Sequence, residues 1–255
     1  MTASTQTVRE IALEDPRSIR VFEEFGIDYC CGGRKPLAEA CAGKNVAVDA
    51  VIAALERAVQ GKSRETDDWN TQPLATLTRH IVETYHAIIN REIPRITQLA
   101  GKVVNRHGES KPELGAIQAK FAQLSAELTQ HCGKEEVVLF PYIAKLEGAI
   151  ATEAARPQGC FGSVTNPIAM MTLEHDAAGA LIEEIRQLSD GFRPPAGACP
   201  TFPAFYNGLY EFEQDLHRHT SKTTFCSDAR WRGKQPDCDP PAGRCLLSRL
   251  VSNHG

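Results

Sequence analysis

The 255-residue sequence contains no long hydrophobic run and no concentration of positive charge. Nowhere do about 18 consecutive apolar residues occur, the length that a membrane-spanning helix needs. The first twenty residues also lack the apolar core of a signal peptide. We therefore expect a cytoplasmic protein with no membrane partner. The net charge is −4, and lysines and arginines do not cluster with interleaved aromatic residues, so we expect no nucleic-acid partner.

Strand-like alternation of polar and apolar residues is also missing, whereas helical periodicity is abundant. Residues 1–60 form a small helical unit, and the polar stretch 61–72 is a linker. From Pro73 onward, four long helical patterns are separated by loops rich in Gly and Pro. The predicted fold class is therefore all-α, with a small N-terminal helical domain, a four-helix bundle over 73–222 and an irregular tail over 223–255.

Each of the four bundle helices places one histidine on its apolar seam, at alternating steps of three and four residues. These histidines are His86, His131, His175 and His219, and the second seam also carries Glu135, between Leu128 and the inward-facing Val138 and Tyr142. A single histidine on an apolar face is usually a core residue with satisfied hydrogen bonds. Four imidazoles and a carboxylate buried without partners would cost about 1–3 kcal/mol each. A shared metal ion, iron, zinc or manganese, would satisfy all five groups.

Other ionisable residues neighbour these seams without lying on them. His107, at the end of the first long helix, has two interpretations: a hydrogen-bond partner of a metal ligand, or a cation that interacts with the helix dipole. Glu83, Glu136 and Glu174 are next to the candidate ligands in sequence but on other helix faces. We expect them to be solvated or to support the ligands.

Nine cysteines are scattered along the chain. In a reducing compartment this favours reactive, metal-linked or buried thiols over a disulfide framework. Cys30 and Cys31 are adjacent and precede two glycines in a turn, where backbone amides lower a thiol pKa. They are candidates for a redox or thiol site, and the alternative is a helix-breaking turn with small buried thiols.

The apolar periodicity of the last bundle helix ends after His219. One turn later, where the second helix has a carboxylate, stands Thr223. With permitted codons, a one-base shift after His219 would read His-Leu-Glu-Asn-Asn-Ile-Leu-Phe, which restores the pattern of the second helix. A frame disruption is one hypothesis, and the other is a genuine extension, because the stretch "GKQPDCDPPAGRC" has the composition of a disordered tail.

These motifs together resemble the repair-of-iron-centres family of di-iron proteins. The resemblance covers residues 1 to about 222, with an ScdA-type N-terminal domain and a hemerythrin-like bundle. It is carried by "IDYCCGG", "YHAIINREIP", "HCGKEEVVLFP", "LEHDAAG" and "YNGLYEFEQDLHRH". It implies two non-haem irons per chain, with the ligands His86, His131, Glu135, His175 and His219. The family's second bridging glutamate falls on Thr223, a departure that leaves the second iron one ligand short.

The resemblance also implies a function in the stress response. It implies repair of iron–sulfur clusters damaged by nitric oxide or peroxide, with iron donation as one mechanism, damaged iron–sulfur proteins as partners and function at the Cys30–Cys31 pair. An alternative is a protein that sequesters or senses nitric oxide, as some relatives do in denitrifying bacteria. Reduction of nitric oxide at the di-iron site would make it an enzyme, and a homodimer is among the expected assemblies.

Overall fold

The computed structural model describes residues 6–15, 18–29, 33–60, 72–155, 157–159, 161 and 165–228. Within these ranges the chain is helical and forms no strand, apart from an isolated bridge between Thr7 and Pro36. The prediction of an all-α fold is therefore confirmed. None of the described helices combines the length and the hydropathy needed to cross a membrane.

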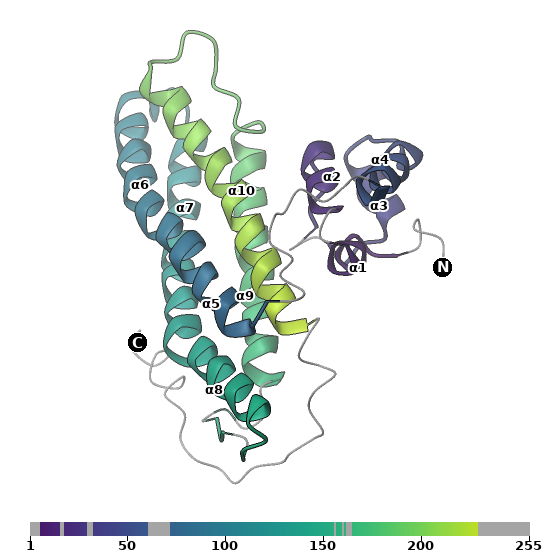
Figure 1. Ribbon diagram of the computed structural model, residues 1–255. Helices are drawn as coiled ribbons and strands as arrows, with labels where there is room; N and C mark the ends of the chain where they lie inside the picture. The colour runs from purple at the N-terminus through teal and green to yellow at the C-terminus, as the bar shows by residue number, and fades with distance from the viewer. Residues whose placement is uncertain are drawn as a thin grey trace.

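Residues before the linker form a separate group of helices, α1 (Val8–Glu14), α2 (Ser18–Phe25), α3 (Leu37–Gly43) and α4 (Val48–Gln60), beside the long helices (Figure 1). A capping box begins α1: the amide of Glu10 donates to the Thr7 hydroxyl at 3.2 Å, and the amide of Thr7 donates to the Glu10 carboxylate at 2.8 Å. The group has an apolar core of its own, which includes Val8, Phe22, Leu37 and Val51.

The bundle consists of four helical rods. The first two rods are interrupted by π-helical turns, whereas the third and fourth are continuous α-helices. The rods are α5–η1–α6 (Leu74–His80, Ile81–His86, Ala87–His107), α7–η2–α8 (Glu113–Lys134, Glu135–Leu139, Phe140–Ala151), α9 (Thr165–Leu188) and α10 (Thr201–Asp228). In Figure 1, α6, α7, α9 and α10 run side by side. Each rod thus supplies one wall of a shared interior.

The last rod is longer than the sequence suggested, because α10 continues to Asp228. The prediction that the irregular tail begins at 223 is wrong for residues 223–228. Thr220 and Thr223 occupy the inner face and are each 2 % exposed, and the Thr223 hydroxyl donates to the carbonyl of His219 at 3.0 Å. The Thr223 hydroxyl is satisfied within the helix in this way, whereas the buried Thr220 hydroxyl has no hydrogen-bond partner among the described residues. The inner face therefore continues with small polar side chains instead of large apolar ones. The rest of the expected tail, 229–255, and most of the expected linker, 61–71, lie outside the described residues.

The π-helical turns correct the predicted apolar seams by one residue. Val138 and Tyr142 were expected to face the interior, but both are only half-buried, and the apolar residues buried after η2 begins include Leu139 and Ile143. In the first rod, Ile81 is buried, whereas Val82 is half-buried. A π turn closes its hydrogen bonds over five residues instead of four, so it places one extra residue in the turn and shifts the inward face accordingly.

The bundle interior is divided into three layers along its length. One apolar cluster includes Ile89, Leu128, Ala178 and Leu216. A second includes Leu77, Ile81, Leu139, Ile143 and Met171. In the first three rods the candidate ligands lie at the boundary of these clusters, and in α10 His219 follows Leu216 of the first cluster and precedes the buried Thr220 and Thr223. The polar residues thus form a single layer with an apolar cluster on either side.

Two contacts join the N-terminal helices to the bundle next to this layer. The Arg34 guanidinium lies 2.8 Å from the carboxylate of Asp176, the residue that follows His175. The ring of Tyr29 makes an edge contact with the ring of His217. The N-terminal unit therefore rests on α9 and α10 at the level of the polar layer.

Candidate metal centre

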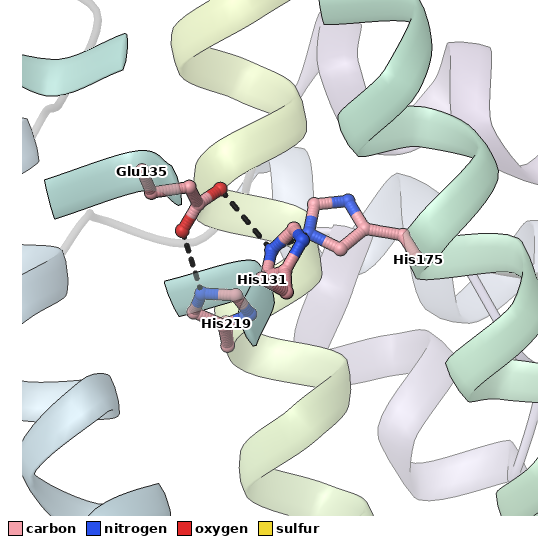
Figure 2. Close-up of side chains that lie close together, drawn as sticks. All are labelled: His131, Glu135, His175 and His219. Carbon is pink, nitrogen blue, oxygen red and sulfur yellow. Dashed lines mark hydrogen bonds and ion pairs between the residues drawn. The ribbon is translucent and has the colours of Figure 1, made fainter. Parts of the chain in front are cut away.

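Five side chains from all four rods meet in the polar layer. Figure 2 shows that His131, Glu135, His175 and His219 point toward one another from three of the rods, and His86 completes the group from the first. Donor atoms of His131, Glu135, His175 and His219 all lie within 4.8 Å of one another. The structure thus brings together all five residues that the sequence singled out.

The imidazoles form two pairs. His131 Nε2 and His175 Nε2 are 2.9 Å apart, and His86 Nε2 and His219 Nε2 are 3.1 Å apart. Two nitrogen lone pairs at such distances repel unless a proton or a metal cation lies between or beside them. A metal ion that binds nitrogen at about 2.1 Å spaces neighbouring donors by about 3–3.5 Å, so both pairs are close to the spacing of ligands on one ion.

The Glu135 carboxylate lies between the two pairs. Its Oε1 is 3.3 Å from His131 Nε2, and its Oε2 is 3.0 Å from His86 Nε2 and 3.4 Å from His219 Nε2. One oxygen therefore faces each pair, as in a carboxylate that bridges two ions. Among the described residues, neither Glu135 Oε1 nor His219 Nδ1 has a hydrogen-bond partner, although both atoms are buried. A bound metal ion would satisfy the carboxylate oxygen and remove its desolvation cost.

Two further carboxylates orient the histidine rings. His86 Nδ1 lies 2.7 Å from Glu136 Oε1, and His131 Nδ1 lies 2.9 Å from Glu174 Oε2. Because a carboxylate only accepts, each Nδ1 carries the proton and each Nε2 is directed into the layer. Lys134 holds Glu174 in place with a contact of 2.5 Å. Carboxylates that hold ligand histidines in this way are typical of metal sites.

The other expected support, His107, is elsewhere. Its Nε2 lies 3.1 Å from the thiol sulfur of Cys199, and its ring contacts Phe202. His107 is 21 residues beyond His86 on the same rod, about 30 Å along the helix axis, so it does not reach the polar layer. Glu83 is exposed. Cys30 and Cys31 lie outside the described residues.

The π-helical turns end or begin at the ligands themselves. His86 is the last residue of η1, and Glu135 is the first residue of η2. Such turns are rare and occur often at functional sites, because they change the direction of a side chain relative to the rest of its helix. Each π turn contains one extra residue that helical periodicity does not predict, and both turns are located at the candidate centre.

Electrostatics divides the four imidazoles into two kinds. Burial opposes protonation of His86, but hydrogen bonds to Cys132 and Glu135 raise its pKa to about 10. Burial likewise opposes protonation of His131, and Glu135 and Glu174 nevertheless raise its pKa to about 9. Burial, together with the positive charge on neighbouring histidines, lowers the pKa of His175 and His219. Without metal, each pair thus contains one protonated and one neutral ring.

The donor set fits a divalent transition metal. Neutral imidazole nitrogens and a carboxylate are ligands for iron, zinc and manganese, and a bundle interior is a recurrent place for such sites. His86, His131, Glu135, His175 and His219 would hold the metal.

The comparisons with known proteins agree with this geometry. Residues 77–224 match the family described as "Hemerythrin HHE cation binding domain", and residues 4–59 match the ScdA_N family, a domain of unknown function. The iron-sulfur cluster repair protein YtfE of Yersinia pestis (strain Pestoides F) is 34% identical over 219 residues, which covers 86% of this chain and 93% of that protein. The YtfE protein of Yersinia pseudotuberculosis serotype IB (strain PB1/+) matches with the same identity and coverage.

Metal binding should release protons. The folded pKa values of about 10 for His86 and about 9 for His131 lie above the ordinary 6.5, so both rings are protonated at pH 7.5 in the metal-free protein. The stabilisation that these protons give the metal-free protein is complete below pH 6.5 and is lost as the pH rises through 9–10. We expect loading with zinc at pH 7.5, followed with a pH indicator in dilute buffer, to release at least two protons per chain. Release of less than one proton would contradict this assignment.

The orienting carboxylates should matter for metal affinity. The Glu174→Gln variant, which weakens the hold on the His131 ring, should lose about 10–100-fold in metal affinity, as should Glu136→Gln for His86. Competition with a chelator of known affinity measures this loss. Glu83→Gln is the matched control, because Glu83 is exposed and close in sequence to His86. Equal affinities in all three variants would show that the contacts have no orienting role.

Proposed function

Because the chain belongs to the repair-of-iron-centres family, with an ScdA-type domain and a hemerythrin-like domain, we propose that it is a non-haem di-iron protein that helps to restore damaged iron–sulfur clusters. The observation that carries the proposal is the convergence of four imidazoles and one carboxylate, from four rods, in a sealed layer of the bundle. The two histidine pairs with Glu135 between them support two irons per chain.

Iron bound there would supply a redox-active cation with positions open to small molecules, and a source of the metal that a damaged cluster has lost. The chain's own residues bind and orient. Glu136 and Glu174 fix the rings of His86 and His131, and the apolar layers on either side exclude water. The phenyl ring of Phe140, a member of the second apolar cluster, stacks on the His86 ring.

A short route to solvent supports the exchange of ions that repair by iron donation requires. Whereas the ligand rings are at most 4 % exposed, the side chain of Glu136 is 40% exposed and that of Glu174 is 23% exposed. Each of these carboxylates touches a buried ring on one side and water on the other. The proton on His86 can therefore leave by way of Glu136, and the proton on His131 by way of Glu174. Cations can approach along the same two carboxylates.

The repair function is tested with an enzyme whose iron–sulfur cluster has been damaged by nitric oxide. The iron-loaded protein should reactivate this enzyme beyond the level given by the same concentration of free ferrous iron. The His131→Ala variant removes one ligand and should lose the effect, whereas Glu83→Gln should keep it. Recovery that equals that of free iron would refute the repair proposal.

A second candidate function is binding of nitric oxide, as a sequestering or sensing protein. The observation that favours it is the small number of protein donors, since Thr223 brings no charged group to the layer and its hydroxyl is bonded to the His219 carbonyl. Two irons that share five donors keep positions open to a diatomic ligand. Reduction of nitric oxide, the cytoplasmic location and the homodimer stay predictions.

Titration of the diferrous protein with each gas separates these functions. If the protein is a nitric-oxide binder, an anaerobic spectral titration should show a saturable ferrous–nitrosyl complex with a defined stoichiometry per chain, and the His131→Ala variant should not form it. The absence of any complex with nitric oxide would reject this second function and leave the repair function untouched. A parallel titration with oxygen shows which gas is preferred.

A further inference from the structure

One buried thiol lies beside the candidate centre and has no role in the account above. Cys132 follows His131 in α7, is 4 % exposed and carries a free thiol. Donor atoms of His86, Cys132 and His219 all lie within 4.8 Å of one another, and all three residues are buried. The Cys132 sulfur is therefore close to both imidazoles of this pair. The thiol therefore faces the pair formed by His86 and His219, and not the pair formed by His131 and His175.

Helix geometry explains why neighbouring residues serve different pairs. Successive side chains of an α-helix differ in direction by about 100°. The α7 helix packs against both α6 and α9, so His131 reaches the α9 histidine while Cys132 reaches the histidine at the junction of η1 and α6. One turn of a single helix thus contributes to both halves of the layer.

The position of Cys132 matters because the fourth rod lacks a charged donor. Thr223 stands one turn after His219, where a carboxylate could have reached the layer, and its hydroxyl is engaged by the His219 carbonyl. Glu136 contacts this pair only from the outside, at His86 Nδ1, and is 40% exposed. On the inner side, Glu135 Oε2 is the one carboxylate oxygen that the described residues bring to both His86 Nε2 and His219 Nε2. A second buried anion is missing from this side of the layer.

We propose that Cys132 is a metal ligand and that His86, Cys132 and His219, with Glu135 Oε2, form a sulfur-containing subsite for a divalent transition metal. The inference rests on the metal centre proposed above and deepens it. On binding, the metal–sulfur bond forms and the thiol proton leaves to solvent, so no electron is transferred. The thiolate then supplies the negative charge that Thr223 does not. Two nitrogens, one sulfur and one oxygen are a donor set suited to zinc, cobalt(II) or iron(II).

Cobalt(II) reports sulfur ligation directly, because a thiolate bound to it gives an intense charge-transfer band in the near ultraviolet. Full-length metal-free protein is titrated anaerobically with cobalt(II), and bound metal is counted by elemental analysis. We expect two ions per chain and a thiolate band. In Cys132→Ser the band should disappear and the affinity for one of the two ions should fall at least tenfold, while the circular dichroism spectrum stays unchanged.

The matched control is Cys199→Ser, since Cys199 contacts His107 at the far end of the bundle; this variant should keep the band. If Cys132→Ser does not fold, X-ray absorption of the zinc-loaded unmodified chain replaces it, and a sulfur neighbour at about 2.3 Å is expected. A Cys30→Ser, Cys31→Ser double variant should keep that neighbour. A band that is missing from the unmodified protein, or that survives in Cys132→Ser, would overturn the proposal.

Because these measurements need no damaged cluster, they separate this inference from the repair function. A protein that shows the band but repairs nothing would refute the repair function alone. A protein that repairs but binds both ions without sulfur would refute the Cys132 ligand alone.

Discussion

The structure depends on one constraint, the electrostatic cost of a polar layer inside a helical bundle. Four imidazoles and a carboxylate are at most 4 % exposed and lie between two apolar clusters. In the metal-free chain two protons, on His86 and His131, offset part of this cost. Divalent cations can offset more of it, because they replace both protons and also satisfy Glu135 Oε1. The bundle is therefore suited to binding positive charge within the polar layer.

The rest of the bundle serves to keep that level in place. Apolar side chains above and below exclude water, which strengthens every interaction within the layer. Glu136 and Glu174 fix two of the rings from the outer side. The Arg34–Asp176 ion pair holds the N-terminal helices against the segment that carries His175. The apolar packing, the ring orientations and the position of the N-terminal unit thus all support the same polar layer.

Much of this arrangement follows from helical periodicity, and the remainder has identifiable physical reasons. The five residues of the layer were recognisable because polar groups occupied apolar positions of the seams. Val138 and Tyr142 were assigned wrongly because a fixed period of 3.6 residues cannot anticipate a π turn. The pairing of Glu136 and Glu174 with ligand rings depends on contacts between rods, which sequence spacing does not define. Cys132 was overlooked because a small thiol next to a histidine looks like any core residue. His107 does not reach the ligands because it lies about six helical turns beyond His86, next to Cys199 and to Phe202 of α10.

The π turn Glu135–Leu139 shows how this chain balances regular helix packing against the chemistry of the polar layer. A π turn interrupts the regular hydrogen bonding of an α-helix, and such turns are rare and occur often at functional sites. This one begins at Glu135, the carboxylate of the polar layer. A bundle selected only for thermal resistance would discard it, so its presence marks the point at which this fold gives up regularity in favour of chemistry.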